Sequence, residues 1–416
     1  MSDRLTTLGT NIKDARHVAM DILRPSAREL ETGLAFHEEA LVVESYSLGI
    51  SAPQSWGRLR RIQEAGGSAI ELRDAIEEQL TLGHLPDETT RELYRQAWRA
   101  SGVNCSFQGA GEESNDPVRL LRRLGRYTHL MDALPGVLAR VTTAEDIVTH
   151  HQNGCRTLCL VTNGIPLPST RVSVPEELGL IRTFAQLGVK SMHLTYNRRN
   201  AIGDGCGEIA DGGLSAFGHD VIAEMNSLGI IVDLAHTGWK TSLEAVRASQ
   251  CPVMISHAAC WSVHQHIRCK SDEVIRAVAE AGGLIGITNV PAFLGGSGDI
   301  SRLLDHIDYA VNQFGVDAVA IGTDRSYALP ASESPDDSFH LRQRLPWESL
   351  WSGTSPNLDA AWNQPRQVQS LVWTNWPLFT VGLVQRGYRE EDIRKIIGGN
   401  VLRVARDNWK TPATLE

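Results

Sequence analysis

The sequence predicts an α/β protein whose core is a closed (β/α)8 barrel of the TIM type. Eight short apolar runs typical of buried strands occur along the 416 residues, and segments with helical periodicity separate most of them. Such alternation indicates a parallel sheet, eight units close a barrel, and the chain length fits a barrel with additions. The alternative, an open doubly wound sheet, lacks its usual glycine-rich phosphate turn after the first strand.

The elements follow the chain in order. One or two helices are expected in 10–40 with a break at Pro25, and a charged, alanine-rich helical excursion over 56–100 follows the first strand. An Asp cap followed by proline predicts a helix over 116–134. The strand candidates are 40–50, 101–109, 155–164, 189–197, the two runs that end at His236 and His257, 283–290 and 316–324.

We expect one barrel domain over 1–416, with its strands within about 41–324 and a loop followed by C-terminal helices over 326–416. The composition, 42% hydrophobic and 21% charged, is sufficient for a large core. The net charge of −9 and the absence of a Lys/Arg run exclude non-specific nucleic-acid binding. Seven cysteines without a CxxC pair, no secretory signal and no window of about 18 apolar residues predict a cytoplasmic protein without a membrane span.

Two neighbouring strand candidates end on a histidine. GIIVDLA leads to His236, PVMIS leads to His257, and TSLEAVRASQ between them has helical spacing. Strand C-termini meet at one end of a parallel barrel, so the two imidazoles are expected to converge. Imidazole is a good ligand for zinc and similar divalent ions. The alternative is a pair of histidines whose hydrogen bonds are satisfied within the protein.

Other polar side chains follow strand candidates and are expected at the same mouth. They are Tyr46, Ser47, Gln108, Thr162, Asn163, Tyr196, Asn197, Asn289 and Asp324. Asp324 could be a third metal ligand, a base that takes a proton from a bound water, or simply a helix N-cap. Arg268, in the loop after the sixth strand, could hold a substrate carboxylate or form a surface ion pair.

Five passages follow one another in the chain: LGVKSMHLTYN, DGGLSAFGHDVIAEMNSLGIIVDLAHTG, CPVMISHAACWSVHQHIRCKSDEVIRAVAEAGGLIGI, VDAVAIGTD and IRKIIGGNVLRV. In order and spacing they resemble the membrane (renal) dipeptidase family of the amidohydrolase superfamily. The resemblance implies a (β/α)8 barrel, which in this family typically holds two zinc ions bridged by a glutamate. His236 and His257 match the histidines of the second metal. Asp324 matches the strand-eight aspartate, a proposed proton shuttle, and Arg268 matches the arginine that binds the substrate carboxylate.

The chain departs from the family pattern at the first metal, at the bridge between the metals and at an active-site histidine. Tyr46 and Leu48 stand where the family has a His-x-Asp pair, Thr162 replaces the bridging glutamate, and Tyr196 replaces the strand-four histidine. These replacements indicate a divergent branch that lacks the ligands of the first metal. One divalent ion, zinc by preference, is then expected at the two remaining histidines.

Three functions are compatible with these residues. The first is a dipeptidase-like metallohydrolase that cleaves a dipeptide or other small amide bearing a carboxylate, with Asp324 and Tyr196 in catalytic roles. Its substrate-binding residues would be Arg268, Asn197, Asn163 and Tyr46. The alternatives are a metal-independent isomerase or lyase on the same barrel and a non-catalytic homologue that binds a small molecule. The resemblance also implies a homodimer.

Overall fold

The computed structural model describes residues 2–111, 116–167, 173–331, 351 and 359–409. Its main sheet contains eight parallel strands in chain order. They are β1 (Val43–Ser47), β3 (Cys105–Gly109), β5 (Arg156–Thr162), β6 (Val189–His193), β7 (Ile231–Asp233), β8 (Met254–Cys260), β10 (Leu284–Ile287) and β11 (Val319–Ile321). The chain after β11 returns to β1, where Asp324 N donates to Tyr46 O at 3.3 Å. The sheet is therefore nearly closed, which confirms the predicted (β/α)8 fold class.

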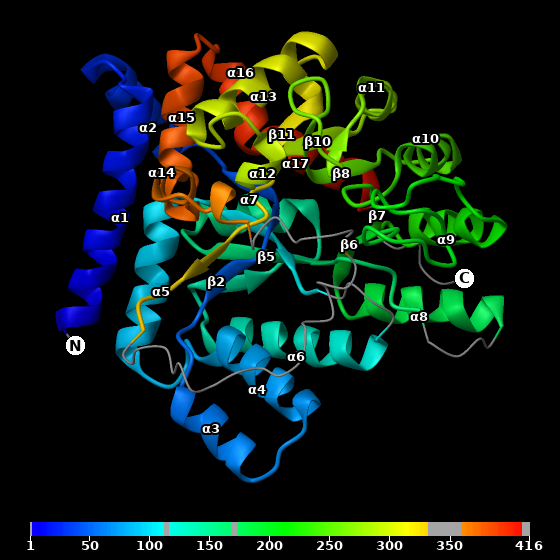
Figure 1. Ribbon diagram of the computed structural model, residues 1–416, viewed down its shortest axis with the longest axis horizontal. Coiled ribbons are helices and arrows are strands. Elements are labelled where there is room, and N and C mark those ends of the chain that lie inside the picture. Colours follow the sequence, from blue (N-terminus) through cyan, green and yellow to red (C-terminus); the bar gives the residue numbers. More distant parts are fainter. Residues whose placement is uncertain (1, 112–115, 168–172, 332–350, 352–358, 410–416) are drawn as a thin grey trace.

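Helices surround the barrel strands (Figure 1). They are α6 (Pro117–Ala133), α7 (Ala144–Gln152), α8 (Val174–Gln186), α9 (Ala216–Ser227), α10 (Trp239–Ala248), α11 (Asp272–Glu280) and α13 (Ile300–Phe314), with a short α12 (Pro291–Leu294). Polar caps begin many of them, as where the Asp116 side chain accepts from Arg119 N. Because the strands face helices outside and packed side chains inside, nearly all their residues are buried.

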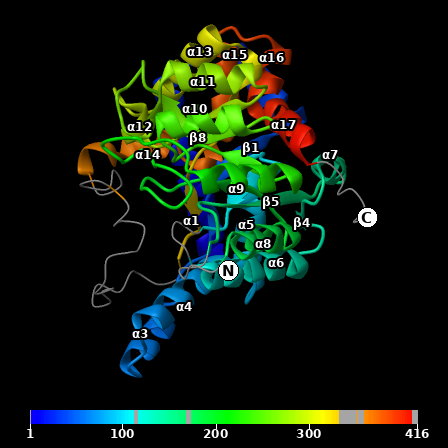
Figure 2. The same ribbon diagram turned by 90° about the vertical axis from the view of Figure 1, so that its right-hand side faces the viewer.

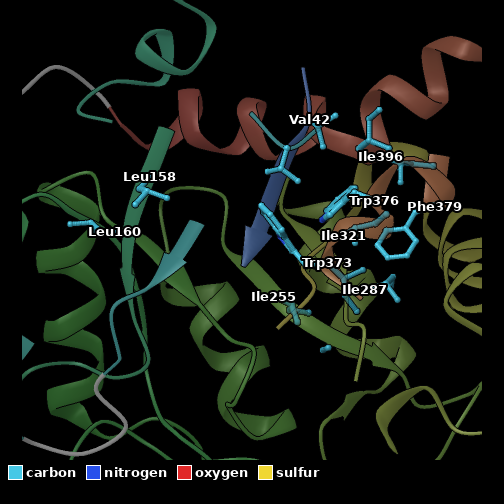
Figure 3. Close-up of a cluster of buried hydrophobic side chains, with 14 of the residues drawn as sticks. Val42, Leu158, Leu160, Ile255, Ile287, Ile321, Trp373, Trp376, Phe379 and Ile396 are labelled. Carbon is cyan, nitrogen blue, oxygen red and sulfur yellow. The ribbon is translucent and has the colours of Figure 1, made fainter. Parts of the chain in front are cut away.

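The helices at the two ends of the chain pack together beside the barrel (Figure 1). Helix α1 (Ser2–Leu23) packs against α14 (Pro365–Ser370), and α2 (Ala27–Glu39) packs against α15 (Trp376–Gln385). After α16 (Glu390–Arg394), the last helix, α17 (Asn400–Asn408), packs instead against β1, β10 and β11. The break between α1 and α2 falls at Pro25, as predicted. Figure 3 shows Trp373, Trp376 and Phe379 grouped with strand residues Ile287 and Ile321.

The predicted excursion consists of α3 (Trp56–Glu64), α4 (Ala69–Leu82) and α5 (Glu88–Ser101). Helix α3 extends away from the rest of the chain (Figure 2). Helix α4 is held against α6 by the Glu77 carboxylate, whose Oε1 lies 2.7 Å from the Arg119 guanidinium and 2.8 Å from that of Arg123. None of the helices within the described ranges combines the length and apolar character that a membrane crossing requires.

The structure adds a small parallel sheet that the sequence does not predict. Strand β2 (Gly49–Ser51), after β1, pairs with β12 (Ser326–Ala328), after β11. This pairing ties together the chain segments that leave the first and the last barrel strand at their C-terminal ends. Strand β8 also runs past His257 to Cys260 instead of ending at the histidine. Most of the predicted loop over 326–366 lies outside the described residues.

Candidate active site

A cavity of about 510 Å³ opens at the C-terminal ends of the barrel strands. Five strand ends contribute polar residues to its lining, which are Tyr46, Asn163, Tyr196, His236, Asp324 and Arg325, and Ser326 and Asn363 add two more. Its apolar lining includes Leu48, Val290, Phe293, Trp351, Val368, Val372 and Trp373. The volume suits a small molecule, and the position is the one where barrel enzymes carry out their chemistry.

The two histidines converge as the strand pattern predicts. His236 Nε2 lies 3.0 Å from His257 Nε2, and both rings are almost completely buried. Burial lowers the pKa of both rings well below the usual range, and the Arg268 charge lowers it further. Both imidazoles are therefore neutral at ordinary pH.

Hydrogen-bond partners assign a tautomer to each ring. His236 Nδ1 lies 2.8 Å from Asn197 Oδ1, an acceptor, so Nδ1 carries the proton and Nε2 accepts. His257 Nε2 then donates to that acceptor, and His257 Nδ1 accepts from Ser256 Oγ at 2.9 Å. This assignment gives every ring nitrogen of the pair one matching partner, so the pair is satisfied by the protein itself.

Asn197 is held in position by a glycine-rich loop. Its backbone has φ 56, a left-handed conformation that asparagine tolerates better than most residues. A Cβ on Gly205 would lie 2.2 Å from the backbone carbon of Asn197, so only glycine permits this approach. Cys206 Sγ and Gly207 N complete the contact, donating to Asn197 Oδ1 at 3.2 Å and to Asn197 O at 2.7 Å.

A tyrosine stacks on each histidine. The Tyr46 ring lies 3.9 Å from the His257 ring centroid, and the Tyr196 ring lies 4.0 Å from that of His236. Tyr46 OH also donates to Asn163 Oδ1 at 2.5 Å. Tyr46 and Tyr196 are two of the positions at which the sequence departs from the family pattern. Their rings cover the imidazole pair on the cavity side, with His236 still reaching the lining.

Arg268 lies behind the histidines rather than on the cavity. It is completely buried, and its guanidinium donates to the carbonyl oxygen of Ala235 and, at 3.1 Å, to that of His257. One guanidinium nitrogen lies 3.3 Å from His236 Nε2. These contacts direct the positive charge at the histidine pair, so Arg268 does not reach a ligand in the cavity.

Asp324 follows β11 and lines the cavity. Its backbone is left-handed, with φ 53, and its nitrogen bonds to β1. Burial raises the pKa of its carboxyl to about 6, although the charges of Arg268, Arg325 and His193 act in the opposite direction. A carboxyl with a pKa of about 6 is mostly ionised at neutral pH and is more basic than an ordinary aspartate, as a general base requires.

A polar network that the strand pattern does not predict lies inside the barrel. His193 Nε2 lies 2.8 Å from Asp233 Oδ2 and 3.4 Å from Ser256 Oγ, which in turn bonds to His257. Burial alone would raise the pKa of Asp233, but the charge of His193 and its hydrogen bond lower it overall. An aspartate inside the apolar run GIIVDLA was the available signal, because a buried carboxylate needs a partner.

Five of the predicted site residues line the cavity: Tyr46, Asn163, Tyr196, His236 and Asp324. Three lie behind that lining, within the buried shell: Asn197, His257 and Arg268. Arg325, next to Asp324, lines the cavity and was not singled out from the sequence. Its position directly after the last barrel strand was the signal that could have found it.

The described residues do not provide a metal site like that of the family. Among them, no three His, Cys, Asp or Glu side chains come close enough together to hold an ion. The two imidazoles that do converge are hydrogen-bonded to each other, and a guanidinium lies against one of them. A divalent ion would have to displace that cation and move the His257 proton, so the donor set does not fit the expected zinc.

The comparisons with known proteins agree with this architecture. Residues 91–333 match the model of the membrane dipeptidase family, peptidase family M19. The dipeptidase verJ of Clonostachys rogersoniana is 28% identical over 229 residues, 54% of this chain and 50% of that protein. The match thus covers about half the length of this curated relative.

Solved structures share the fold over most of the chain. An amidohydrolase from Pseudomonas aeruginosa has a TM-score of 0.64 and 24% identity, covering 91% of this chain and 99% of that one. A metallopeptidase from Rhodobacter sphaeroides, liganded with a phosphinate mimic of the dipeptide L-Ala-D-Ala, has a TM-score of 0.63 and 17% identity, covering 89% and 99%. These structures show the shared fold, and the family match, which covers more than half of its residues, shows that the chain belongs to the membrane dipeptidase family.

Proposed function

We propose that this chain is a hydrolase of small amides that carry a carboxylate, dipeptides among them. The observation that carries the proposal is the cavity at the barrel mouth, where the Asp324 carboxyl, Tyr196 and His236 line one space. Membership of the dipeptidase family supports the reaction class. The relative's name, dipeptidase, and the dipeptide mimic bound to the Rhodobacter protein support the substrate class.

The chain's own residues suggest a route for the hydrolysis. The ionised Asp324 carboxylate takes a proton from a water molecule as that water attacks the amide carbonyl. Tyr196 donates its O–H to the oxyanion that forms. Asp324 then returns the proton to the amine as the C–N bond breaks, so the carboxylate is regenerated and one water is consumed. General-base assistance of this kind contributes about 10²- to 10⁴-fold to a rate.

No step of this route passes through a metal ion, because the donor set does not fit one. Bound zinc in a hydrolase acidifies water and polarises the carbonyl. The sequence predicts one zinc at His236 and His257, whereas the arrangement of the two imidazoles and the guanidinium argues against it, and elemental analysis of the purified protein decides between the two. The homodimer and the cytoplasmic location also stay predictions, the former testable by light scattering on the eluted protein.

A second candidate is a metal-independent isomerase or lyase that removes a proton next to a carboxylate. The same donor set favours it, since Asp324 with a pKa of about 6 is a suitable base and Tyr196 a suitable hydrogen-bond donor. The two candidates differ in their products. Hydrolysis releases a free amine, whereas an isomerase or lyase leaves the amide bond intact.

The test is a screen of dipeptides and N-acyl amino acids for release of free amine, with and without chelator. We expect turnover that survives chelation and falls about 10²- to 10⁴-fold in Asp324→Asn. Asp220→Asn is the matched control, because Asp220 is exposed on α9, away from the cavity lining. Loss of activity on chelation would instead support the metallohydrolase hypothesis, and binding without turnover would support a non-catalytic protein that binds a small molecule.

A further inference from the structure

We infer that Arg325, rather than Arg268, anchors the substrate carboxylate, and that the substrate carries an apolar, preferably aromatic, group beside that carboxylate. The inference rests on the proposed function, whose substrate bears a carboxylate. It depends on the difference between these two arginines in burial, contacts and position.

Arg268 is already committed to other contacts. Its guanidinium is bonded to two backbone carbonyls and lies against His236, and the Phe293 ring lies 5.3 Å from its guanidinium carbon. A bidentate bond to a carboxylate needs two parallel N–H groups facing the ligand. No solvent-accessible surface of Arg268 remains to offer them.

Unlike Arg268, Arg325 lines the cavity. It is only partly buried, and among the described residues of the cavity lining it is the only Lys or Arg. Its guanidinium has no hydrogen bond or ion pair with any described residue, and it does not form an ion pair with Asp324. Burial lowers the pKa of Arg325 and the Asp324 charge raises it, but an arginine stays protonated at physiological pH.

Hydrogen bonds hold the backbone of Arg325 in place. Arg325 O accepts from Leu48 N at 3.1 Å and from Ser47 Oγ at 3.3 Å, and the next residue enters the β12–β2 pairing. The side chain therefore leaves a braced segment and not a free loop. A charged side chain that lines a cavity from a braced backbone, without a partner, is suited to bind an anion of the ligand.

The apolar lining determines the rest of the ligand. Phe293 and Trp351 stack with their centroids 6.1 Å apart, and Trp373 lines the same space. Trp373 is fixed by a 2.8 Å bond from its Nε1 to Glu44. Aromatic walls of this kind favour a flat apolar group. With Asp324 beside Arg325 in sequence, the bond to be cleaved lies near the carboxylate, as in a short peptide ending in an apolar residue.

The experiment compares the wild type with Arg325→Gln and Arg325→Lys on Gly-Phe and Gly-Phe-amide. Because the two substrates differ only at the carboxylate, the ratio of their kcat/KM values measures how much the enzyme gains from binding that carboxylate. We expect the wild type to prefer the acid by about 10- to 100-fold, the ratio to approach one in Arg325→Gln, and Arg325→Lys to restore part of it. Arg247→Gln, which removes an exposed arginine on the outer helix α10, should leave the ratio unchanged.

A binding measurement separates this inference from the proposed function. Calorimetry with N-acetyl-phenylalanine and its amide needs no turnover. If neither peptide is hydrolysed but wild-type binding of the acid depends on Arg325, the hydrolase proposal fails and the anchor stands. If the preference for the acid survives in Arg325→Gln, or the wild type shows no preference in either assay, the inference is overturned while any observed hydrolysis stands.

Discussion

The pH dependence of turnover is the most direct test of Asp324 as the base. Its carboxyl has a pKa of about 6 because burial penalises the charged form, against the charges of Arg268, Arg325 and His193. The base is active when ionised, so kcat/KM rises with pH through about 6. With that pKa, about a tenth of the carboxyl is ionised at pH 5 and about nine tenths at pH 7, which predicts a roughly tenfold difference.

The perturbation is Asp324→Asn, assayed by amine release between pH 5 and pH 8. Asparagine keeps the shape but cannot accept the proton, so the rate should fall about 10²- to 10⁴-fold and the limb near pH 6 should disappear. Glu44→Gln is the rival control, since burial raises the pKa of Glu44 to about 7 but that side chain does not line the cavity. If the rise of kcat/KM near pH 6 persists in Asp324→Asn, or disappears in Glu44→Gln, Asp324 is not the base.

Three further predictions concern stability and metal. The Glu44 pKa of about 7 lies above the ordinary value of 4.5, so its stabilising contribution is present below about pH 4.5 and is lost as pH rises through about 7. Between pH 6 and pH 8 the free energy of unfolding of the wild type, measured in urea, should fall by about 1.4 kcal/mol because of this group. In Glu44→Gln this fall should be absent, and an equal fall in both proteins would contradict the role given to Glu44. Asp233→Asn should destabilise the fold by about 3–5 kcal/mol, because it removes one partner of the buried contact with His193, whereas a change under about 1 kcal/mol would show that the pair carries little. Elemental analysis should find no stoichiometric zinc; about one zinc per chain that is lost in His236→Ala/His257→Ala would contradict the donor-set argument.

The barrel could be predicted because its signals are local. Each strand is a short apolar run that can be identified without knowing its neighbours, and the chain order of the strands is also their order in the sheet. The pairing of β2 with β12 could not be predicted in this way. Each strand is three residues long, and they are far apart in the chain, so only the closed barrel brings them together.

In the candidate site, too, the features set by local sequence could be predicted and those set by tertiary contacts could not. The strand ends predict which residues reach the mouth, and five of the eight predicted side chains line the cavity. The direction of a loop side chain such as Arg268 is set by the carbonyls it meets, which no local pattern encodes. The partnership of His193 with Asp233 and Ser256 joins three strands, and it follows only once their register is known.

The replacements at the barrel mouth support one another, which argues against a site that has simply decayed. Tyr46 stacks on His257 and donates a hydrogen bond to Asn163. One replaced residue, Tyr46, thus supplies a hydrogen-bond partner to the neighbour of another, Thr162. A permanently charged guanidinium lies against the His236 ring, which its charge helps to keep neutral. A buried cation of this kind costs several kcal/mol in desolvation unless hydrogen bonds to it compensate, as the carbonyls of Ala235 and His257 do here. Arg268 behind the lining and Arg325 on it place two positive charges near the single carboxylate of Asp324, so positive charge predominates here although the chain as a whole carries a net charge of −9. An anionic ligand is what such a field selects.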